Sequence, residues 1–188
     1  DAELPGGGWP CNAITEILQP QPSLCEWRLL SPALAKLVAS EGQILLVGPP
    51  KRPHAPGLIQ LGIAEKNLVW IAADTPAERL WSTEQLVKSN PRGGAILSWL
   101  PQARPEQLRR LQVHAQSCDC PVFLFRPEAA QLDASPAPLR VLATLIFMRW
   151  TIFSLRAWLR RCRNSRRSRS RAMPSCCCVC QSLKSVCF

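Results

Sequence analysis

Short apolar runs alternate with longer amphipathic stretches through most of the chain. The runs contain few polar positions, which is typical of strands that are buried on both faces of a parallel sheet. Because each run is short, we predict a strand rather than a helix over each of them. They occupy residues 14–18, 43–47, 68–72, 94–100 and 122–125.

The amphipathic stretches between these runs have helical periodicity. Residues 26–40, 76–89 and 105–117 carry apolar side chains at spacings of three and four, so each predicts a helix with one apolar face. Thr75 is the predicted N-cap of the second helix. Pro32 lacks a backbone N–H, so we expect the first helix to begin later than Glu26.

This order of elements predicts the fold class. Strands that alternate with helices of about 12–15 residues indicate βαβ units, in which a crossover helix returns the chain to a parallel neighbour. We therefore expect an α/β fold with a mainly parallel sheet flanked by helices. Residues 1–143 are enough for one such domain.

The connection between the first strand and the first helix lies where a phosphate-binding loop would be found. Such a loop needs two glycines, a lysine and a hydroxyl, which wrap the phosphates, neutralise them and hold Mg²⁺. Those positions hold Gln19, Leu24, Cys25 and Glu26. Leu24 resists a left-handed backbone by about 1–2 kcal/mol, and a carboxylate ~4 Å from a phosphate charge costs on the order of 4 kcal/mol. We interpret the segment as a degenerate phosphate loop and expect no cofactor.

Other catalytic chemistry has no better candidate. The strand over 94–100 ends without an acid that could hold a metal ion. His54 and His114 have no serine or aspartate placed for a catalytic triad. Cys118 and Cys120 are too close in sequence for the usual Cys-x₂-Cys metal site, and we interpret them as ordinary reduced thiols. We therefore expect a protein that is not an enzyme and holds no metal.

Candidate binding residues lie where two predicted strands end. Doubly wound folds place their sites at the carboxyl ends of the strands. Trp99, Leu100 and Pro101 end one strand and Arg126 ends the next, so we name these four residues as candidates for binding a protein partner. The alternatives are a core tryptophan that closes the sheet and an arginine that is solvated or caps a helix. The basic residues 51–54 predict an exposed loop.

Charge divides the chain into two unequal parts. All 13 acidic residues lie before residue 149, together with 13 of the 23 basic residues. The last forty residues hold the other ten basic residues and six of the ten cysteines. We therefore treat residues 144–188 as a separate basic, cysteine-rich tail. Its cysteines lack histidine partners, so we expect no zinc site there.

Arginines in the tail recur at spacings that place them on one face of a helix. We predict an amphipathic helix over 145–171, suited to nucleic acid or to an anionic membrane surface. The candidate nucleic-acid contacts are Arg156, Arg160, Arg163 and Arg167. We expect no transmembrane helix and no signal peptide, and hence a cytoplasmic protein.

Several segments, in the same order, resemble one bacterial family. They read DAELPGGGWPCNAITEIL and EWRLL within residues 1–30, ILLVGPPKRPHAP at 44–56, AILSWLP at 95–101, LRRLQ at 108–112 and FLFRPEAAQLDASP at 123–136. Over about residues 1–142 the chain is similar to ImuA, an SOS-induced accessory protein of translesion DNA synthesis. ImuA is related to the cell-division inhibitor SulA and, more distantly, to RecA. The resemblance implies a RecA-like fold that has lost its ATPase loop.

An adaptor function is what this resemblance implies. ImuA-type proteins act with ImuB, an inactive relative of the Y-family polymerases, and with an error-prone polymerase. The alternative is a SulA-type inhibitor that binds the division GTPase FtsZ. Glu26 and Arg28 match the family's loop, whereas its glycines are absent here.

The resemblance ends near Leu142, where the composition changes abruptly. The following residues are rich in arginine, serine, cysteine and tryptophan and contain no acid. A reading-frame shift in GC-rich DNA produces that composition, and Asp1 is not a methionine. We hypothesise a partial or frame-shifted gene product. Sequencing the coding DNA tests this: an intact family C-terminus in another frame is expected, and its absence from every frame would refute the idea.

Overall fold

The structure is a computed structural model that describes residues 4, 7–22, 25–91 and 93–143. Leu24 of the degenerate loop and the whole tail at 144–188 lie outside the described residues. The helix at 145–171 and its nucleic-acid contacts Arg156, Arg160, Arg163 and Arg167 therefore stay predictions. Within the described part, no helix is long and apolar enough to cross a membrane.

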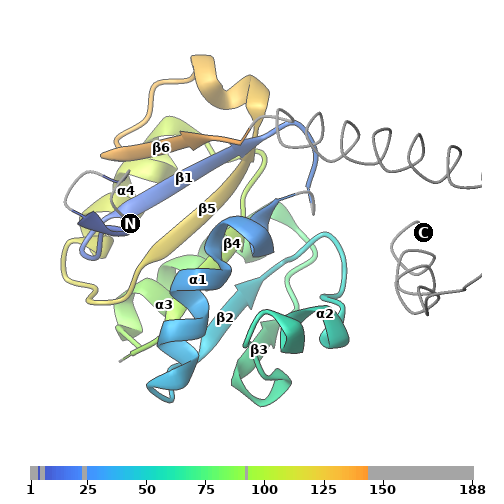
Figure 1. Cartoon of the computed structure of the whole chain (residues 1–188). Helices are drawn as coiled ribbons and strands as arrows, with labels where there is room; N and C mark the ends of the chain where they lie inside the picture. Colours follow the sequence, from blue (N-terminus) through green and yellow to red (C-terminus); the bar gives the residue numbers. More distant parts are fainter. Residues whose placement is uncertain (1–3, 5–6, 23–24, 92, 144–188) are drawn as a thin grey trace, which may run out of the picture. The chain divides into compact units, whose positions relative to one another are not determined.

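Within those residues, six strands form one sheet in which all neighbours run parallel. The strand order is β3-β2-β4-β5-β1-β6 (Figure 1). The prediction of an α/β fold with a parallel sheet flanked by helices is confirmed. The strands are β1 (Ile14–Gln19), β2 (Ile44–Val47), β3 (Leu68–Ile71), β4 (Ala95–Trp99), β5 (Val122–Pro127) and β6 (Leu139–Leu142).

Helices cover both faces of the sheet (Figure 1). On one face, α1 (Glu26–Ala39) and α2 (Ala55–Gln60) pack on a cluster of buried residues that includes Ile17, Leu46 and Phe123. On the other face, α3 (Pro76–Ser89) and α4 (Pro105–Ala115) pack on a second such cluster. Two short 3₁₀ helices, η2 (Glu65–Asn67) and η3 (Glu128–Leu132), complete the described elements. The strands thus end together at one edge, the carboxyl edge, from which the connections lead to both faces.

The helix boundaries follow the predicted signals with one exception. Thr75 caps α3 as predicted: its hydroxyl accepts the N–H of Glu78, and the Glu78 carboxylate accepts the N–H of Thr75. The expected late start of α1 is wrong, because the helix begins at Glu26 and contains Pro32 in its interior. The hydroxyl of Ser31 donates to the Arg28 carbonyl at 3.5 Å, which compensates for the N–H that Pro32 lacks.

Two strands depart from the sequence pattern. β3 lies at one end of the sheet, and its Val69 and Trp70 are exposed, although its apolar sequence predicted a buried strand. β6 forms the opposite end, although β5 had been expected as the last strand before residue 142. Among the described residues, β6 pairs with β1 alone. Its sequence includes Arg140 and it is only partly buried, so its pattern does not stand out from a loop.

A buried ion network fastens β6 to the sheet. Glu16, in the middle of β1, is fully buried. Its carboxylate accepts hydrogen bonds from Arg140 Nε at 2.8 Å, Ser135 Oγ at 2.8 Å and Arg126 Nη1 at 3.4 Å. Because these residues come from β6, the preceding loop and β5, the network fixes the strands around β1. It thereby sets the position of the β1–α1 connection.

Candidate functional site

The degenerate loop holds a carboxylate at the place where a phosphate loop would receive its anion. β1 ends at Gln19, and α1 begins at Glu26 after a proline-containing turn. The Glu26 side chain bends back over this turn, and the residue is only 1% exposed. Its Oε2 atom accepts the backbone N–H of Cys25 at 3.2 Å. An acid at this place satisfies the positive N-terminal end of the helix.

Glu26 also joins three elements of the carboxyl edge. Its Oε1 atom accepts hydrogen bonds from Gln19 Nε2 at 2.8 Å and from Trp99 Nε1 at 3.2 Å. Gln19 ends β1 and Trp99 ends β4, so one carboxylate holds together the ends of two strands and the start of α1. From the sequence, we predicted that a carboxylate at position 26 is hostile to phosphate. It gave no signal that Glu26 is a buried structural acceptor.

Cys25, at the position that a lysine occupies in a working phosphate loop, carries no positive charge. Burial, and then the charge of Glu26, raise the pKa of the Cys25 thiol to about 11. Cys25 is therefore a neutral thiol near pH 7, and its Sγ donates to Gln19 Oε1 at 3.4 Å. A phosphate entering this loop would meet a carboxylate and a neutral thiol instead of a lysine.

The end of β4 lacks the acid that a metal-dependent nucleotidase would place there. Ser98 is fully buried, and its hydroxyl lies 2.6 Å from that of Thr83 in α3. This pair satisfies both hydroxyls within the core. In the part of the chain that the structure describes, no group of three or more His, Cys, Asp or Glu residues could hold a metal ion.

Trp99 closes the carboxyl edge as a core residue. It is 6% exposed, and its ring stacks on Phe125 with centroids 4.6 Å apart. The hydrogen bond to Glu26 satisfies its indole N–H. The Trp99 ring therefore fits the alternative interpretation from the sequence, a core tryptophan that closes the sheet.

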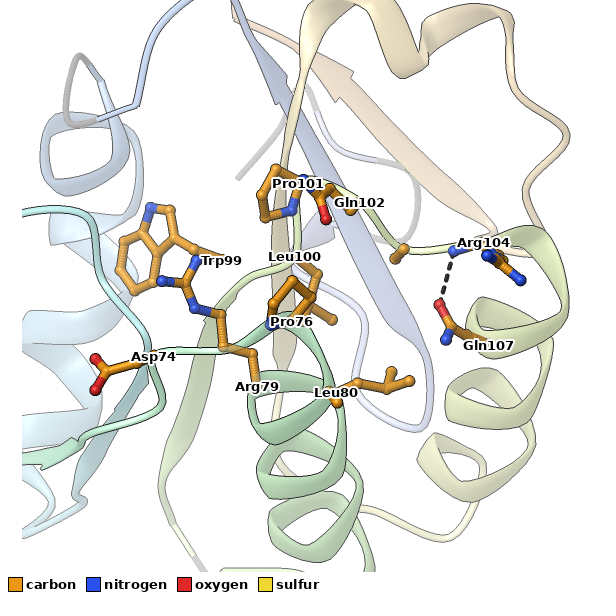
Figure 2. A pocket seen from close by; sticks show the side chains of 12 residues that line it. Asp74, Pro76, Arg79, Leu80, Trp99, Leu100, Pro101, Gln102, Arg104 and Gln107 are labelled. Carbon is orange, nitrogen blue, oxygen red and sulfur yellow. Dashed lines mark hydrogen bonds between the residues drawn. The ribbon is translucent and has the colours of Figure 1, made fainter.

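A cavity of about 440 Å³ opens beside Trp99 (Figure 2). It lies between the first turn of α3, the first turn of α4 and the loop that follows β4. Its lining mixes polar, charged and apolar side chains. The lining residues are Asp74, Pro76, Ala77, Arg79, Leu80, Trp99, Leu100, Pro101, Gln102, Ala103, Arg104 and Gln107.

A smaller cavity of about 110 Å³ adjoins the first, because Arg79, Trp99 and Pro101 line both. Prolines from four different connections form much of its wall, which makes this surface apolar and stiff. They are Pro20, Pro22, Pro50, Pro101 and Pro127.

Arg79 is fixed between the two cavities. Its Nε atom donates to the Ala73 carbonyl at 2.9 Å, and Arg79 lines both cavities together with Trp99. The stem of Arg79 lies over Gly48, which follows β2 and has a φ of 56°. A Cβ at Gly48 would come within 2.6 Å of Arg79 Nε, so the glycine makes room for the arginine.

Two arginines give the larger cavity a positive character. Arg79 lies in the first turn of α3, and Arg104 is the N-cap of α4, where its N–H donates to Gln107 Oε1 at 2.9 Å. Both helices also direct their positive ends to this cavity. Asp74 is the one acid among the lining residues. The cavity is therefore suited to a carboxylate or another anionic group.

Sequence reasoning missed Arg79 and Arg104, although a signal was present. A basic side chain in the first turn of a helix opposes the helix dipole, typically by 0.3–1 kcal/mol, so its presence there suggests another role. Arg79 is the fourth residue of one predicted helix and Arg104 immediately precedes the next, so each places a positive charge near a helix N-terminus.

The four predicted partner-binding residues all line these cavities. Trp99, Leu100 and Pro101 line the larger one, and Trp99, Pro101 and Arg126 line the smaller one. Pro101 is exposed, whereas Leu100 is buried. Arg126 is neither solvated nor a helix cap, because it is 3% exposed and donates to Glu16, Asp133 and the Ala103 carbonyl.

His54 and His114 both take part in contacts that stabilise helices. His54 caps α2, where its Nδ1 atom accepts the N–H of Gly57 at 3.3 Å. His114 Nε2 lies 3.4 Å from Glu84 at the contact between α3 and α4. The exposed loop predicted at residues 51–54 is confirmed for Lys51 and Arg52.

No protein-family model matches the chain, and no curated protein matches it. The chain is similar to the crystal structure of SulA from Pseudomonas aeruginosa, with 20% sequence identity and a TM-score of 0.47. The match covers 63% of this chain and 99% of that one. The fold class assigned above follows from the sheet topology itself.

Proposed function

We propose that this chain is a non-catalytic adaptor of SOS-induced, error-prone translesion DNA synthesis. The observation that carries the non-catalytic part is the buried Glu26 carboxylate at the phosphate position. The ImuA-like segments within residues 1–142 support the assignment to translesion synthesis. Its partners would be an ImuB-like relative of the Y-family polymerases and an error-prone polymerase, in the cytoplasm.

The absence of nucleotide chemistry is part of this proposal. Cys25 supplies no cation, and the buried Ser98 supplies no metal-binding acid at the end of β4. A P-loop enzyme stabilises the charge of the transferred phosphoryl group with a lysine and a metal ion. The described residues of the loop offer a carboxylate in their place.

The carboxyl edge is the proposed docking surface for the partner. The Ala73 carbonyl accepts a hydrogen bond from Arg79 Nε, so the guanidinium is pre-organised rather than free to move. The stiff proline wall and the positive cavity together suit an extended segment that carries an acidic side chain. Such a charge contact would raise the association rate and fix the register of the partner.

Capture of partners from DNA-damaged cells tests the proposal. The wild-type chain, Arg79→Glu and Arg109→Glu would be immobilised in parallel, and the proteins that each retains would be identified by mass spectrometry. Arg109 is a matched control because it is exposed on α4 and lies outside both cavities. Thermal melting checks that each variant is folded.

Three outcomes are informative. The proposal expects a Y-family-like protein on the wild type and on Arg109→Glu, with about tenfold less on Arg79→Glu, which corresponds to ~1.4 kcal/mol. Recovery of FtsZ alone would favour the SulA-type inhibitor. Recovery of neither protein from damaged cells would contradict both functions.

A further inference from the structure

Two cysteines meet inside the loop that joins α4 to β5. Cys118 and Cys120 are buried, and their Sγ atoms lie 3.1 Å apart. Neither takes part in a disulfide. The residues are only two positions apart, so this contact needs a tight local turn of the backbone. The sequence had suggested two ordinary thiols without a shared role.

The turn is held from both sides. The carbonyl of Cys118 accepts the N–H of Asn12 at 3.0 Å, which ties the turn to the segment before β1. Asp119 exchanges two hydrogen bonds with Asn90, its N–H donating at 2.8 Å and its carboxylate accepting at 3.1 Å. Asn90 is the left-handed C-cap of α3. The two sulfurs are therefore fixed in contact by neighbouring elements.

The contact makes the two thiols unequal. The hydrogen bond from Cys120 lowers the pKa of Cys118 below its ordinary value, although burial acts in the opposite direction. The same hydrogen bond, together with burial, raises the pKa of Cys120. Burial raises the pKa of Cys11 and of Cys25 as well. Among the four described cysteines, Cys118 has the largest thiolate fraction near neutral pH.

We propose that Cys118 and Cys120 are a redox-active dithiol that hydrogen peroxide oxidises to an intrachain disulfide. This inference is independent of the proposed adaptor function. A disulfide has an S–S bond of about 2.05 Å, so the sulfurs need to approach by roughly 1 Å from their present contact. Because both are buried, the oxidant has to be small and uncharged, as hydrogen peroxide is.

The chemistry balances without any further reactant. The Cys118 thiolate attacks one oxygen of hydrogen peroxide, and the O–O bond breaks. Cys118 becomes a sulfenic acid, and hydroxide is the leaving group. The Cys120 sulfur then attacks the Cys118 sulfur. Its proton leaves with the sulfenic oxygen as water. Two electrons pass from the thiols to peroxide, which ends as one water and one hydroxide.

Disulfide formation fits the pair better than metal binding. A structural zinc site needs four ligands, and soft metals favour several thiolates. No group of three or more potential ligands gathers in the described residues. Two sulfurs in contact are, in contrast, the complete set that a disulfide requires.

Trypsin makes the pair easy to observe in the full chain. It cleaves after Arg110 and Arg140 but not between Arg126 and Pro127, so the peptide 111–140 contains Cys118, Cys120 and no other cysteine. The folded chain would be treated with hydrogen peroxide, quenched with catalase, alkylated and digested. Mass spectrometry of this peptide then reports the state of the pair, whatever happens to the other cysteines.

The expected product is a peptide 111–140 that has lost two hydrogen atoms and carries no alkyl group. Dithiothreitol should restore two alkylation sites. Cys120→Ser should lose the disulfide form entirely and accumulate sulfenic or sulfinic acid at Cys118 instead. Cys25→Ser is the control that should leave the result unchanged, because Cys25 lies in a different loop.

Two results would overturn the proposal. One is a wild-type peptide 111–140 that stays fully alkylated while peptides with Cys11 or Cys25 become oxidised. The other is sulfinic acid at Cys118 with Cys120 still free, which would show that the pair does not close. Both readings come from the wild-type chain, so they hold even if a variant fails to fold.

Discussion

Glu26 shows how one residue decides the character of the candidate site. Its carboxylate accepts from the side chains of Gln19 and Trp99 and from the N–H of Cys25. An acid that only weakened phosphate binding would act through its charge and would not need these hydrogen bonds. Their presence indicates that the acid has become part of the structure of the carboxyl edge.

Removing the Glu26 side chain should therefore destabilise the fold. Glu26→Ala leaves the buried donors of Trp99 and Gln19 without their acceptor, and we expect a loss of about 1–3 kcal/mol in the free energy of unfolding. Glu26→Gln keeps one acceptor oxygen and should cost less. Urea denaturation followed by tryptophan fluorescence measures both.

Glu128→Ala is the matched control, because Glu128 is exposed at the start of η3. A Glu26→Ala chain as stable as this control would contradict the structural role of the carboxylate.

The sequence indicated the chemical character of this site better than the contacts that its residues make. Gln19, Cys25 and Glu26 were sufficient to predict a degenerate phosphate loop. The bond from Trp99 to Glu26 spans 73 positions, and the bond from Arg126 to Glu16 spans 110. No local pattern encodes pairs that far apart, so Arg126 was expected at the surface and is buried instead.

At the scale of elements, α3 and α4 are joined by a cluster of charges around Glu84. The Glu84 side chain is 9% exposed and contacts Lys88, Arg110 and His114. The hydrogen bond from Lys88, with support from Arg110, lowers the pKa of Glu84 from its ordinary value of 4.5 despite burial. The folded state therefore favours the charged form of Glu84.

This shift predicts a pH-dependent stability. A carboxylate whose pKa is lowered by folding stabilises the fold above its unfolded pKa, and that contribution is lost as the pH falls through the folded pKa. Glu84→Gln should cost on the order of 1 kcal/mol at pH 7, a modest value because Lys88 and Arg110 are partly exposed to solvent. The difference from wild type should shrink as the pH falls below the ordinary carboxyl pKa. Urea denaturation at pH 7 and at acid pH measures it.

Glu106→Gln serves as the control for this experiment, since Glu106 is exposed in the first turn of α4. A cost of Glu84→Gln that stays constant down to acid pH would show that its charge contacts do not contribute.

Elements with an unbroken buried apolar run or a clear helical period were predicted well, and the others were not. The strands β1, β2 and β4 are continuous buried runs, and α3 has both its N-cap and its length as expected. α2 has six residues, which is too short for a clear helical period, and β6 includes Arg140 and is only partly buried. Pro32 was misjudged because the compensating hydroxyl of Ser31 is a tertiary detail rather than a propensity.

At the scale of the molecule, the parallel sheet brings the four candidate partner-binding residues and the described residues of the degenerate loop to one edge. β1, β2, β4 and β5 end beside one another, so the degenerate loop, Trp99, Arg79 and the proline wall share one surface. The sequence predicted this edge from the order of strands and helices alone. It did not predict the cavity, whose shape depends on how the first turns of α3 and α4 approach Trp99.

We propose that a buried carboxylate has replaced nucleotide chemistry at the carboxyl edge and that this edge binds a protein partner. Thermal melting of the full chain with increasing Mg²⁺-ATP tests the first half directly. A ligand at 100 times its dissociation constant stabilises a protein by about 2.7 kcal/mol, which raises the melting temperature by roughly 5–10 °C. We predict an unchanged melting temperature up to millimolar ATP. A melting temperature that rises steadily with the logarithm of the ATP concentration would contradict the account.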